Sequence, residues 1–178
     1  MDSAKKGEAG DIIAVLRGLR QVRQFRPDPV PEGIITAILE VARWTGSGMN
    51  RQPWEFLLVR DAHLLGELSR SDNAGSHLAG AQFALVVIMA GQMPEIETYD
   101  EGRLTERVML AAAAQGVGAG IWWFKDEGVG AKKLLGIPEG RRVRTAVAFG
   151  YPLASAGTVP KPGDGRKPLD ALVHVDHY

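Results

Sequence analysis

The sequence predicts a mixed α+β fold in a single domain, and three observations support this. Segments with helical spacing alternate with strand-like segments, but without the regular rhythm of a doubly wound parallel sheet. The run from Phe83 to Met89 is continuously apolar, which is typical of a central strand. The chain has 178 residues, 45% of them hydrophobic, which is enough for one packed core.

Five segments have the pattern of helices. They are expected to begin near Asp11, at Pro31, at Asp61, at Asp100 and at Gly128. The three aspartates are expected N-caps, because a short carboxylate can accept the free N–H groups of a first helical turn. The helix from Asp100 to Gln115 is the longest. Its segment from Val108 to Ala114 is apolar nearly all round, which predicts burial on most sides.

Strands and loops fill the remaining chain. Strands are expected at Glu55 to Val59, Phe83 to Met89, Gly118 to Phe124 and Arg144 to Phe149. Two polar stretches, Ser71 to Gly80 and Gln92 to Thr98, are predicted as loops, with Glu95 and Glu97 in solvent. The chain from Gly150 onward is rich in proline and glycine and is expected to wrap over a surface. Residues 1–10 are polar and are predicted to form a flexible tail, which leaves 11–178 as the domain.

Composition excludes several classes of function. The chain has no cysteine, which rules out disulfides, thiolate nucleophiles, iron–sulfur clusters and cysteine-bound zinc. Basic and acidic residues number 21 each, so the basic excess of a typical nucleic-acid-binding protein is missing. No apolar run reaches the roughly 18 residues that a membrane-spanning helix needs. We expect a cytoplasmic protein that binds neither nucleic acid nor membrane.

The segment from Gly46 to Trp54 is the most informative part of the chain. Its two glycines allow a sharp loop that another backbone or a flat ligand can approach closely. Ser47, Asn50 and Gln52 both donate and accept hydrogen bonds, but none is a strong base or nucleophile unaided. The loop can therefore hold a planar, polar-edged ring without doing chemistry itself, which points to a bound cofactor.

Basic residues cluster near both ends of the chain. Arginines recur at every third position, at Arg17, Arg20, Arg23 and Arg26. On a helix Arg20 and Arg23 would share a face, where two guanidinium groups repel unless an anion such as phosphate lies between them. The alternative is a solvated basic face. Arg166 and Lys167 are either plain surface or, if the tail folds back, part of the same anion site.

Other candidate motifs are better explained by structure than by chemistry. The stretch from Gly116 to Gly120 follows a helix and opens a strand, the reverse of a dinucleotide-binding loop. Trp122, Trp123 and Phe124 are predicted to be core residues. The four histidines lack metal-binding spacing and are expected to be surface or hydrogen-bonded residues. No nucleophile elbow or other protein-borne catalytic set is visible.

Five motifs, in order, resemble those of the FMN-dependent nitroreductase family. They are Arg20 to Phe25 with Pro27 to Pro31, Ser47 to Trp54, Asp100 to Arg103 leading into Gly116 to Gly118, Leu135 to Gly140 followed by Phe149 to Pro152, and Arg166 to Leu169. Together they cover nearly the whole chain after the tail. The resemblance implies an intertwined homodimer with a nitroreductase-like fold, in which helices flank a central, mostly antiparallel sheet.

The resemblance also implies two FMN sites at the subunit interface. Arg20 and Gln21 would contact the FMN phosphate or ribityl chain, and Arg166 and Lys167 would reach the same phosphate. Arg23 would lie beside the N1/O2 edge of the flavin. The ring and ribityl chain would be lined, from the other subunit, by Ser47, Gly48, Asn50 and Gln52. The strand end formed by Ile121, Trp123 and Phe124 would place its backbone under the ring and one N–H near flavin N5.

The activity implied is that of an NAD(P)H-dependent flavin oxidoreductase. NADH or NADPH would deliver hydride to flavin N5 and leave, and an electron-poor acceptor such as a nitroaromatic or a quinone would take its place. Three alternatives stay open. The same fold could carry a different flavin reaction, namely dehydrogenation, flavin cleavage or reductive dehalogenation. It could be a flavin- or deazaflavin-binding module without turnover, or a structural dimer with a vestigial site.

The chain departs from the family pattern at three places. Leu19 and Gln21 stand where many members have arginine and serine, so an amide replaces a hydroxyl contact to phosphate. Gly46 stands where proline is common. The link from Met89 to Asp100 is short, whereas longer relatives carry an insertion there that covers the flavin. The pocket is therefore expected to be more open, or to be built by other segments.

Overall fold

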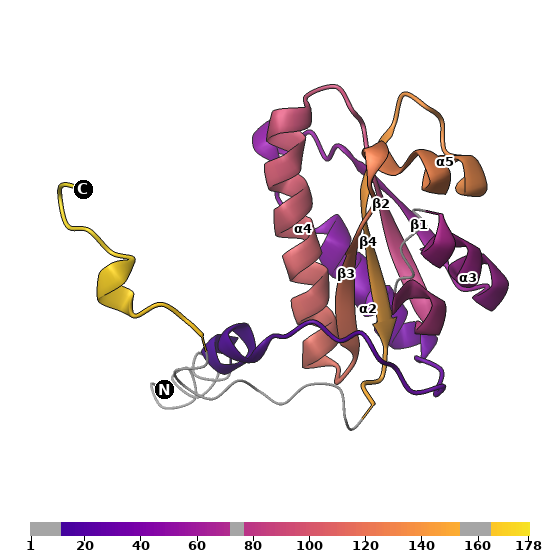
Figure 1. Cartoon of the computed structure of the whole chain (residues 1–178), viewed down its shortest axis with the longest axis horizontal. Coiled ribbons are helices and arrows are strands. Elements are labelled where there is room, and N and C mark those ends of the chain that lie inside the picture. Colours follow the sequence, from indigo (N-terminus) through magenta and orange to yellow (C-terminus); the bar gives the residue numbers. More distant parts are fainter. Residues whose placement is uncertain (1–11, 72–76, 154–164) are drawn as a thin grey trace.

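A four-stranded antiparallel sheet runs through the middle of the protein (Figure 1). The computed structural model describes residues 12–71, 77–153 and 165–178. The strand order is β1-β2-β4-β3, with β1 at Trp54–Val59, β2 at Phe83–Met89, β3 at Gly118–Trp123 and β4 at Arg142–Gly150. All seven residues of β2 are buried, as its continuous apolar run requires. The expected antiparallel α+β fold is confirmed.

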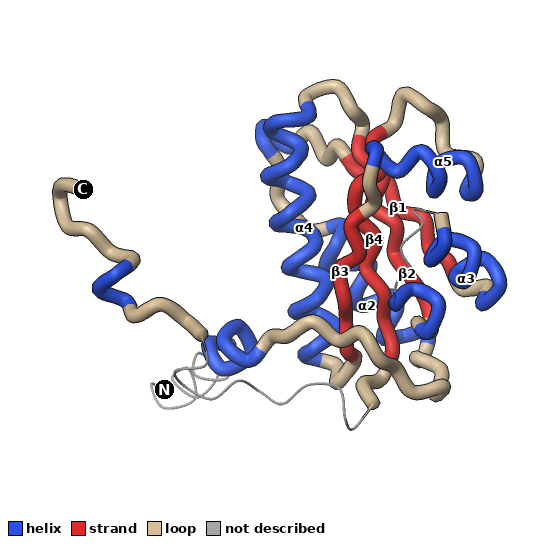
Figure 2. The backbone as a smooth tube through the Cα atoms, in the orientation of Figure 1, coloured by secondary structure: helices blue, strands red, loops and turns tan. Residues whose placement is uncertain are grey.

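Helices cover both faces of the sheet (Figure 2). On one face, α2 (Glu32–Arg43) and α4 (Pro94–Ala114) enclose a hydrophobic core with the inward residues of the strands. On the other face, α3 (Ala62–Arg70) and α5 (Val129–Leu135) enclose a second core. Each strand contributes to both cores, because successive side chains point to opposite sides of a sheet.

β3 forms one edge of the sheet, and the N-terminal arginine segment lies beside it. The Val22 N–H donates to the Ala119 carbonyl oxygen at 2.8 Å, and Phe25 pairs with Pro152 as an isolated bridge. The first helix covers only residues 12–18. The prediction that Arg20 and Arg23 share a helix face is therefore wrong, since the chain leaves the helix before them and pairs with the strand edge.

α4 begins at Pro94 and not at the predicted Asp100. Proline suits the first turn of a helix, and Glu97 accepts the backbone N–H groups of Gly91, Gln92 and Met93 that lead into it. The segment was predicted as a loop because it is polar, but the helix buries part of that polarity. Glu97 is only 3% exposed, so its predicted place in solvent is wrong, and Asp100 lies inside the helix.

The other elements lie close to their predicted places. Asp61 caps α3 by accepting the Leu64 N–H at 2.7 Å, and Gly136, with φ of 67°, ends α5. The predicted loop from Ser71 to Gly80 contains a short 3-10 helix at its end, His77–Gly80. The alanine-rich end of α4 is less buried than predicted, since residues 113 and 114 are exposed. The expected tail and the expected cap at Asp11 lie outside the described residues.

Residues 165–178 extend away from the body of the protein (Figure 1). Every one of them is exposed in the single chain, so the prediction that this part wraps over a surface stays a prediction. Several aliphatic side chains stand more than half in solvent on this segment, namely Leu169, Leu172, Val173 and Val175. The helix at residues 12–18 is also exposed, with Ile12 and Ile13 more than half in solvent.

A substitution at Gly120 tests the packing of the arginine segment on β3. A Cβ there would lie 2.3 Å from the Val22 carbonyl oxygen and 2.9 Å from His77 Nε2. Gly120→Ala should lower the free energy of unfolding by about 1–3 kcal/mol, because the segment must move off the strand. Gly33→Ala in α2 is the matched control, since nothing lies within 4 Å of its added Cβ. Urea unfolding measures both, and wild-type stability in Gly120→Ala would contradict the close approach.

Candidate functional site

The loop over residues 46–53 has a strained backbone. Met49, Asn50 and Gln52 have φ of 52°, 52° and 50°, in the left-handed region that non-glycine residues seldom adopt. The Ser47 hydroxyl accepts the Gln52 N–H at 2.8 Å and holds the turn closed. Strain of this kind persists only where the surroundings impose it, and it is frequent at binding and catalytic sites.

Helix α4 anchors this loop from outside. The buried Asp100 carboxylate accepts the Gly48 N–H at 3.2 Å, and Arg103 lies 3.4 Å from the same carboxylate. Gly46 packs against Arg103 so closely that a Cβ would lie 3.0 Å from the guanidinium. A charge-assisted hydrogen bond from a buried carboxylate is stronger than a neutral one, so α4 determines the backbone shape of the loop.

The polar side chains of the loop face solvent. Asn50 and Gln52 are both exposed, and Gln52 Nε2 donates to Asn50 Oδ1 at 3.3 Å. Each amide carries more donors and acceptors than this one contact uses. The loop therefore presents the polar edge expected from the sequence, on a backbone that is already formed.

Gln21, Arg23 and Ile121, here called the Gln21 cluster, meet at the edge of β3. Gln21 Oε1 accepts the Ile121 N–H at 3.1 Å, although the two residues are 100 positions apart in the sequence. Arg23 Nη2 donates to the same oxygen at 3.4 Å. Two predicted cofactor-binding residues of the N-terminal segment are thus brought to the predicted strand end.

Arg20 lies at a groove whose chemistry suits an anion. Its Nη1 donates to the carbonyl oxygens of Leu19 and Arg17 at 2.6 and 2.9 Å. Its Nε is buried and has no hydrogen-bond partner among the described residues. The groove measures about 370 Å³ and lies between the helix at residues 12–18, the end of α4 and the start of β3. A buried, unpaired guanidinium N–H is costly, and a phosphate oxygen would satisfy it.

The aromatic end of β3 has mixed surroundings. Phe124 is 1% exposed and its N–H donates to the Arg144 carbonyl oxygen at 2.7 Å, so its side chain belongs to the core and its N–H to the sheet. Trp122 is half-buried against the same core. Trp123 is 70% exposed, so its predicted place in the core is wrong.

One chain does not bring all the predicted residues together. The loop meets the face of α4 that carries Asp100 and Arg103, whereas β3 and β4 lie over the face that carries Glu101 and Thr105. At about 100° per residue these two faces point in opposite directions. Helix α4 therefore separates the loop from the Gln21 cluster, and each is half of the predicted site.

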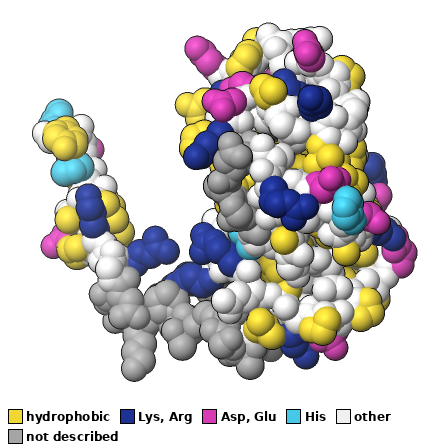
Figure 3. All heavy atoms as spheres, turned by 45° about the vertical axis from the view of Figure 1, so that its right-hand side comes forward, with side chains coloured by type: hydrophobic (Ala, Val, Ile, Leu, Met, Phe, Trp, Pro, Cys, Tyr) yellow, Lys and Arg dark blue, Asp and Glu magenta, His cyan; other side chains and the backbone are white. Residues whose placement is uncertain are grey.

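Arg166 and Lys167 lie on the extended C-terminal segment and are exposed. In Figure 3, basic side chains gather between this segment and the body of the protein. The convergence of Arg166 and Lys167 with Arg20 on one phosphate stays a prediction.

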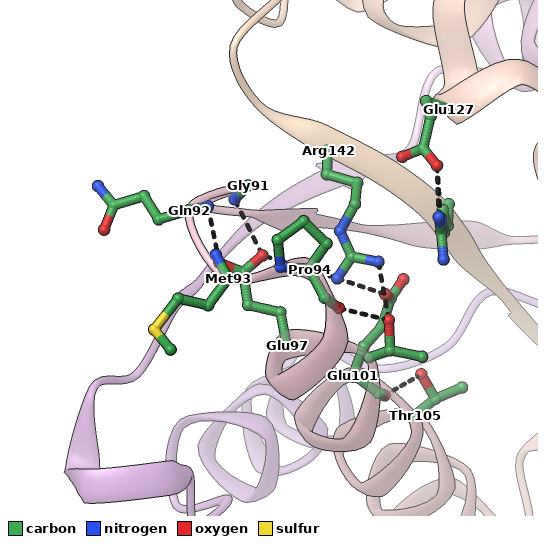
Figure 4. A network of polar contacts seen from close by, with 11 residues as sticks. Gly91, Gln92, Met93, Pro94, Glu97, Glu101, Thr105, Glu127 and Arg142 are labelled. Atoms are coloured by element: carbon green, nitrogen blue, oxygen red, sulfur yellow. Dashed lines mark hydrogen bonds and ion pairs between the residues drawn. The ribbon is translucent and has the colours of Figure 1, made fainter.

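A buried ionic network under α4 was missed by the sequence prediction (Figure 4). Arg142 is 5% exposed and lies 3.3 Å from Glu101 and 3.6 Å from Glu97, and it donates to the Thr98 hydroxyl at 3.2 Å. Glu97 and Glu101 are four positions apart, so a helix places them on one face. This spacing was present in the sequence, but it was not interpreted as helical because Gln92 to Thr98 was predicted as a loop.

The two carboxyl groups of this network titrate differently. Burial raises the pKa of Glu101, and the Thr145 side chain and the nearby arginines offset this only in part. Burial acts in the same direction on Glu97. There, however, three backbone N–H donors and Arg142 outweigh it, and the pKa of Glu97 lies below its ordinary value.

His77 contacts β3 at Gly120 and at Trp122. Its Nε2 lies 3.0 Å from the Gly120 carbonyl oxygen, and its ring meets Trp122 edge-on with 5.9 Å between centroids. Burial lowers the pKa of His77, the bond to Gly120 opposes this, and the charge of Arg23 adds to it. The Nε2 atom donates to the carbonyl oxygen of Gly120, so the expectation of a hydrogen-bonded histidine is confirmed here.

The fold is α+β, and the predicted site residues fall into two separate places, an exposed polar loop and a groove that Arg20 and Gln21 line. The model of the nitroreductase family matches residues 16–82. A provisionally named NADH dehydrogenase/NAD(P)H nitroreductase of Archaeoglobus fulgidus is 32% identical over 152 residues, which cover 80% of this chain and 86% of that protein. The chain belongs to the nitroreductase family.

Solved structures share the fold. An FMN-dependent nitroreductase from Clostridium difficile R20291 has a TM-score of 0.84 at 20% identity, over 93% of this chain and 99% of that chain. A provisionally named nitroreductase from Desulfovibrio desulfuricans, solved in complex with FMN, has a TM-score of 0.78 at 23% identity, over 94% and 97%. The nitroreductase-like fold is thereby confirmed. Within the described ranges, no helix combines the length and the apolar character needed to cross a membrane.

Removal of the Asp100 carboxylate should loosen the loop. Asp100→Ala leaves the Gly48 N–H without its partner, so amide hydrogen exchange over residues 46–52 should accelerate and the free energy of unfolding should fall by roughly 1.5–3 kcal/mol. Asp100→Asn keeps an acceptor oxygen at the same place and should retain most of the protection. Exchange followed by mass spectrometry makes the comparison, and an unchanged loop in Asp100→Ala would show that α4 does not hold it.

Proposed function

We propose that this protein is an FMN-dependent oxidoreductase that takes hydride from NADH or NADPH and passes it to an electron-poor small molecule, such as a nitroaromatic or a quinone. One observation carries the proposal. In a chain of the nitroreductase family, Arg20 lines a groove of about 370 Å³, and its Nε is buried without a hydrogen-bond partner among the described residues. The groove lies next to the Gln21 cluster.

The groove would hold the phosphate end of FMN. Arg20 would bind a phosphate oxygen through the unpaired N–H, and Arg166 and Lys167 would add charge from the C-terminal segment. Gln21 would contact the phosphate or the ribityl chain after its amide rotates away from Ile121. That rotation would free the Ile121 N–H to face the cofactor.

The flavin ring would lie against the end of β3. Because the Phe124 N–H is committed to the sheet, the N–H near flavin N5 would come from Ile121 or Trp123. Arg23 would lie beside the N1/O2 edge, where a cation stabilises the negative charge of the reduced ring and raises its reduction potential. The opposite edge would meet polar groups of the partner subunit's loop, which are those at positions 47, 48, 50 and 52.

Bound FMN supplies the hydride chemistry, and the chain supplies position, charge and a partly dry site. This division of labour agrees with a polar loop that has no strong base and a strand end that offers backbone N–H groups. The protein residues need form no covalent bond to the substrate.

A homodimer would complete the site. Helix α4 keeps the loop and the Gln21 cluster apart within one chain, so a second copy must supply the missing half. The exposed aliphatic side chains at residues 165–178 and 12–18 support this, because a partner surface would bury them. We take residues 11–178 of each copy as one FMN-binding domain.

The optical spectrum of the purified protein tests the proposal. The protein should be yellow, and its flavin absorbance should bleach when NADH or NADPH is added and return with a quinone or a nitroaromatic. A flavin that binds but never takes up hydride would favour a binding module. A folded protein that stays colourless and binds no added FMN would contradict the proposal and leave a structural dimer.

Removal of two phosphate contacts should release the cofactor without unfolding the chain. Each charge-assisted contact contributes roughly 1.5–3 kcal/mol, so Arg20→Ala with Lys167→Ala should weaken FMN binding by at least about 100-fold. Arg107→Ala with Lys133→Ala removes the same charge from exposed positions elsewhere and should bind FMN normally. Titration of the apoproteins with FMN measures both, and wild-type affinity in the first double variant would show that these residues do not hold the phosphate.

A further inference from the structure

A second groove lies between α4 and the ends of β3 and β4. Its volume is about 300 Å³, and its lining combines an aromatic face with polar groups. The lining includes Glu101, Thr105, Ile121, Trp123, Arg144 and Thr145. Two of these residues belong to the strand end at which the proposed function puts the flavin ring. The groove is thus lined both by the buried carboxyl group of Glu101 and by the strand end at which an acceptor would be reduced.

Glu101 has one carboxyl oxygen without a partner. The residue is 4% exposed, and its Oε2 lies 3.3 Å from Arg142 Nη2. Its Oε1 is buried and accepts no hydrogen bond from the described residues. Figure 4 shows how the carboxyl group shares Arg142 with Glu97, so two acids in this buried network compete for one guanidinium.

The surroundings act differently on the two acids. Glu97 accepts three backbone N–H groups, at 2.9, 3.0 and 3.1 Å, which favour its charged form. Glu101 has no such donors, and burial raises its pKa. Thr145, Arg142 and Arg144 act against the rise, and Glu127 adds to it. Arg144 is itself paired with Glu127.

We propose that Glu101 is the acid that protonates the electron acceptor, and that the groove beside it is the acceptor's binding site. The inference rests on the proposed function. The exposed face of Trp123 suits a flat ring. Glu101 is one of the residues that line the same groove.

When the acceptor is a quinone, the electrons and protons of its reduction are all accounted for. The acceptor gains two electrons and one proton as hydride from the reduced cofactor, and it gains the second proton from the Glu101 O–H at its developing oxyanion. The O–H bond of Glu101 breaks, an O–H bond of the hydroquinone forms, and the cofactor is left oxidised. Water in the open groove then returns a proton to the Glu101 carboxylate. Arg142 stabilises that carboxylate meanwhile.

Two acceptors separate proton delivery from electron transfer. Benzoquinone requires a proton for each turnover, whereas ferricyanide takes electrons alone. With the wild-type holoenzyme, the rate of flavin reoxidation by benzoquinone should be highest where Glu101 is protonated. It should fall as pH rises through the raised pKa of this group, while the ferricyanide rate should lack this transition. Stopped-flow mixing between about pH 5 and pH 9 records both.

The variant Glu101→Gln keeps the shape of the side chain and removes the proton. Reoxidation by benzoquinone should slow by roughly 100-fold and lose its pH transition, while reoxidation by ferricyanide and bleaching by NADH should stay as in the wild type. Glu95→Gln, at an exposed position of the same helix but outside the groove, is the matched control and should change none of these rates. Equal slowing with both acceptors, or none with benzoquinone, would overturn the assignment.

Infrared spectroscopy of the apoprotein supplies a readout without turnover. A protonated carboxyl stretch should be present above the pH at which ordinary carboxyls ionise, and it should be absent in Glu101→Gln but present in Glu95→Gln. If no such band exists in the wild type, Glu101 is ionised and is not the donor. The proposed function fails separately, through absent flavin or absent bleaching by NADH, so the two ideas are tested apart.

Discussion

The guanidinium group of Arg142 connects β4 to α4, and the placement of both half-sites depends on that helix. A buried cation between two acids costs desolvation energy, and it is tolerated only where the geometry is good. Here Arg142 meets Glu97 and Glu101 from the sheet side. Asp100, one residue before Glu101 on the same helix, accepts the Gly48 N–H of the loop. A shift of α4 would therefore disturb the loop and the β3 groove at once.

The parts of the structure that follow local rules were predictable from the sequence. The apolar run of β2, the Asp61 cap and the glycine at the end of α5 each have a signature within a few residues. The polar loop over residues 46–53 could be placed for the same reason. The antiparallel character of the sheet could not be worked out locally and was expected from the family resemblance, and the order of the strands was not predicted.

The misplaced elements all depend on contacts between distant segments. The start of α4 could not be recognised in the sequence. The partners of the buried Glu97 are a turn and Arg142 on β4, and the spacing of apolar residues along a helix does not reveal such partners. Arg20 and Arg23 left the helix because Val22 pairs with a strand about 100 residues away. Trp123 lies outside the core because it belongs to β3, a strand at the edge of the sheet, where its side chain is exposed.

The division of labour inside the loop has a practical meaning. Its left-handed backbone is held by Ser47 and by Asp100, and the side-chain amide of Gln52 contacts the side chain and the backbone carbonyl oxygen of Asn50. The groups that hold the backbone therefore differ largely from the exposed amides at positions 50 and 52. New side chains at these two positions could suit a different ring while the loop keeps its shape, provided that they tolerate the left-handed backbone there.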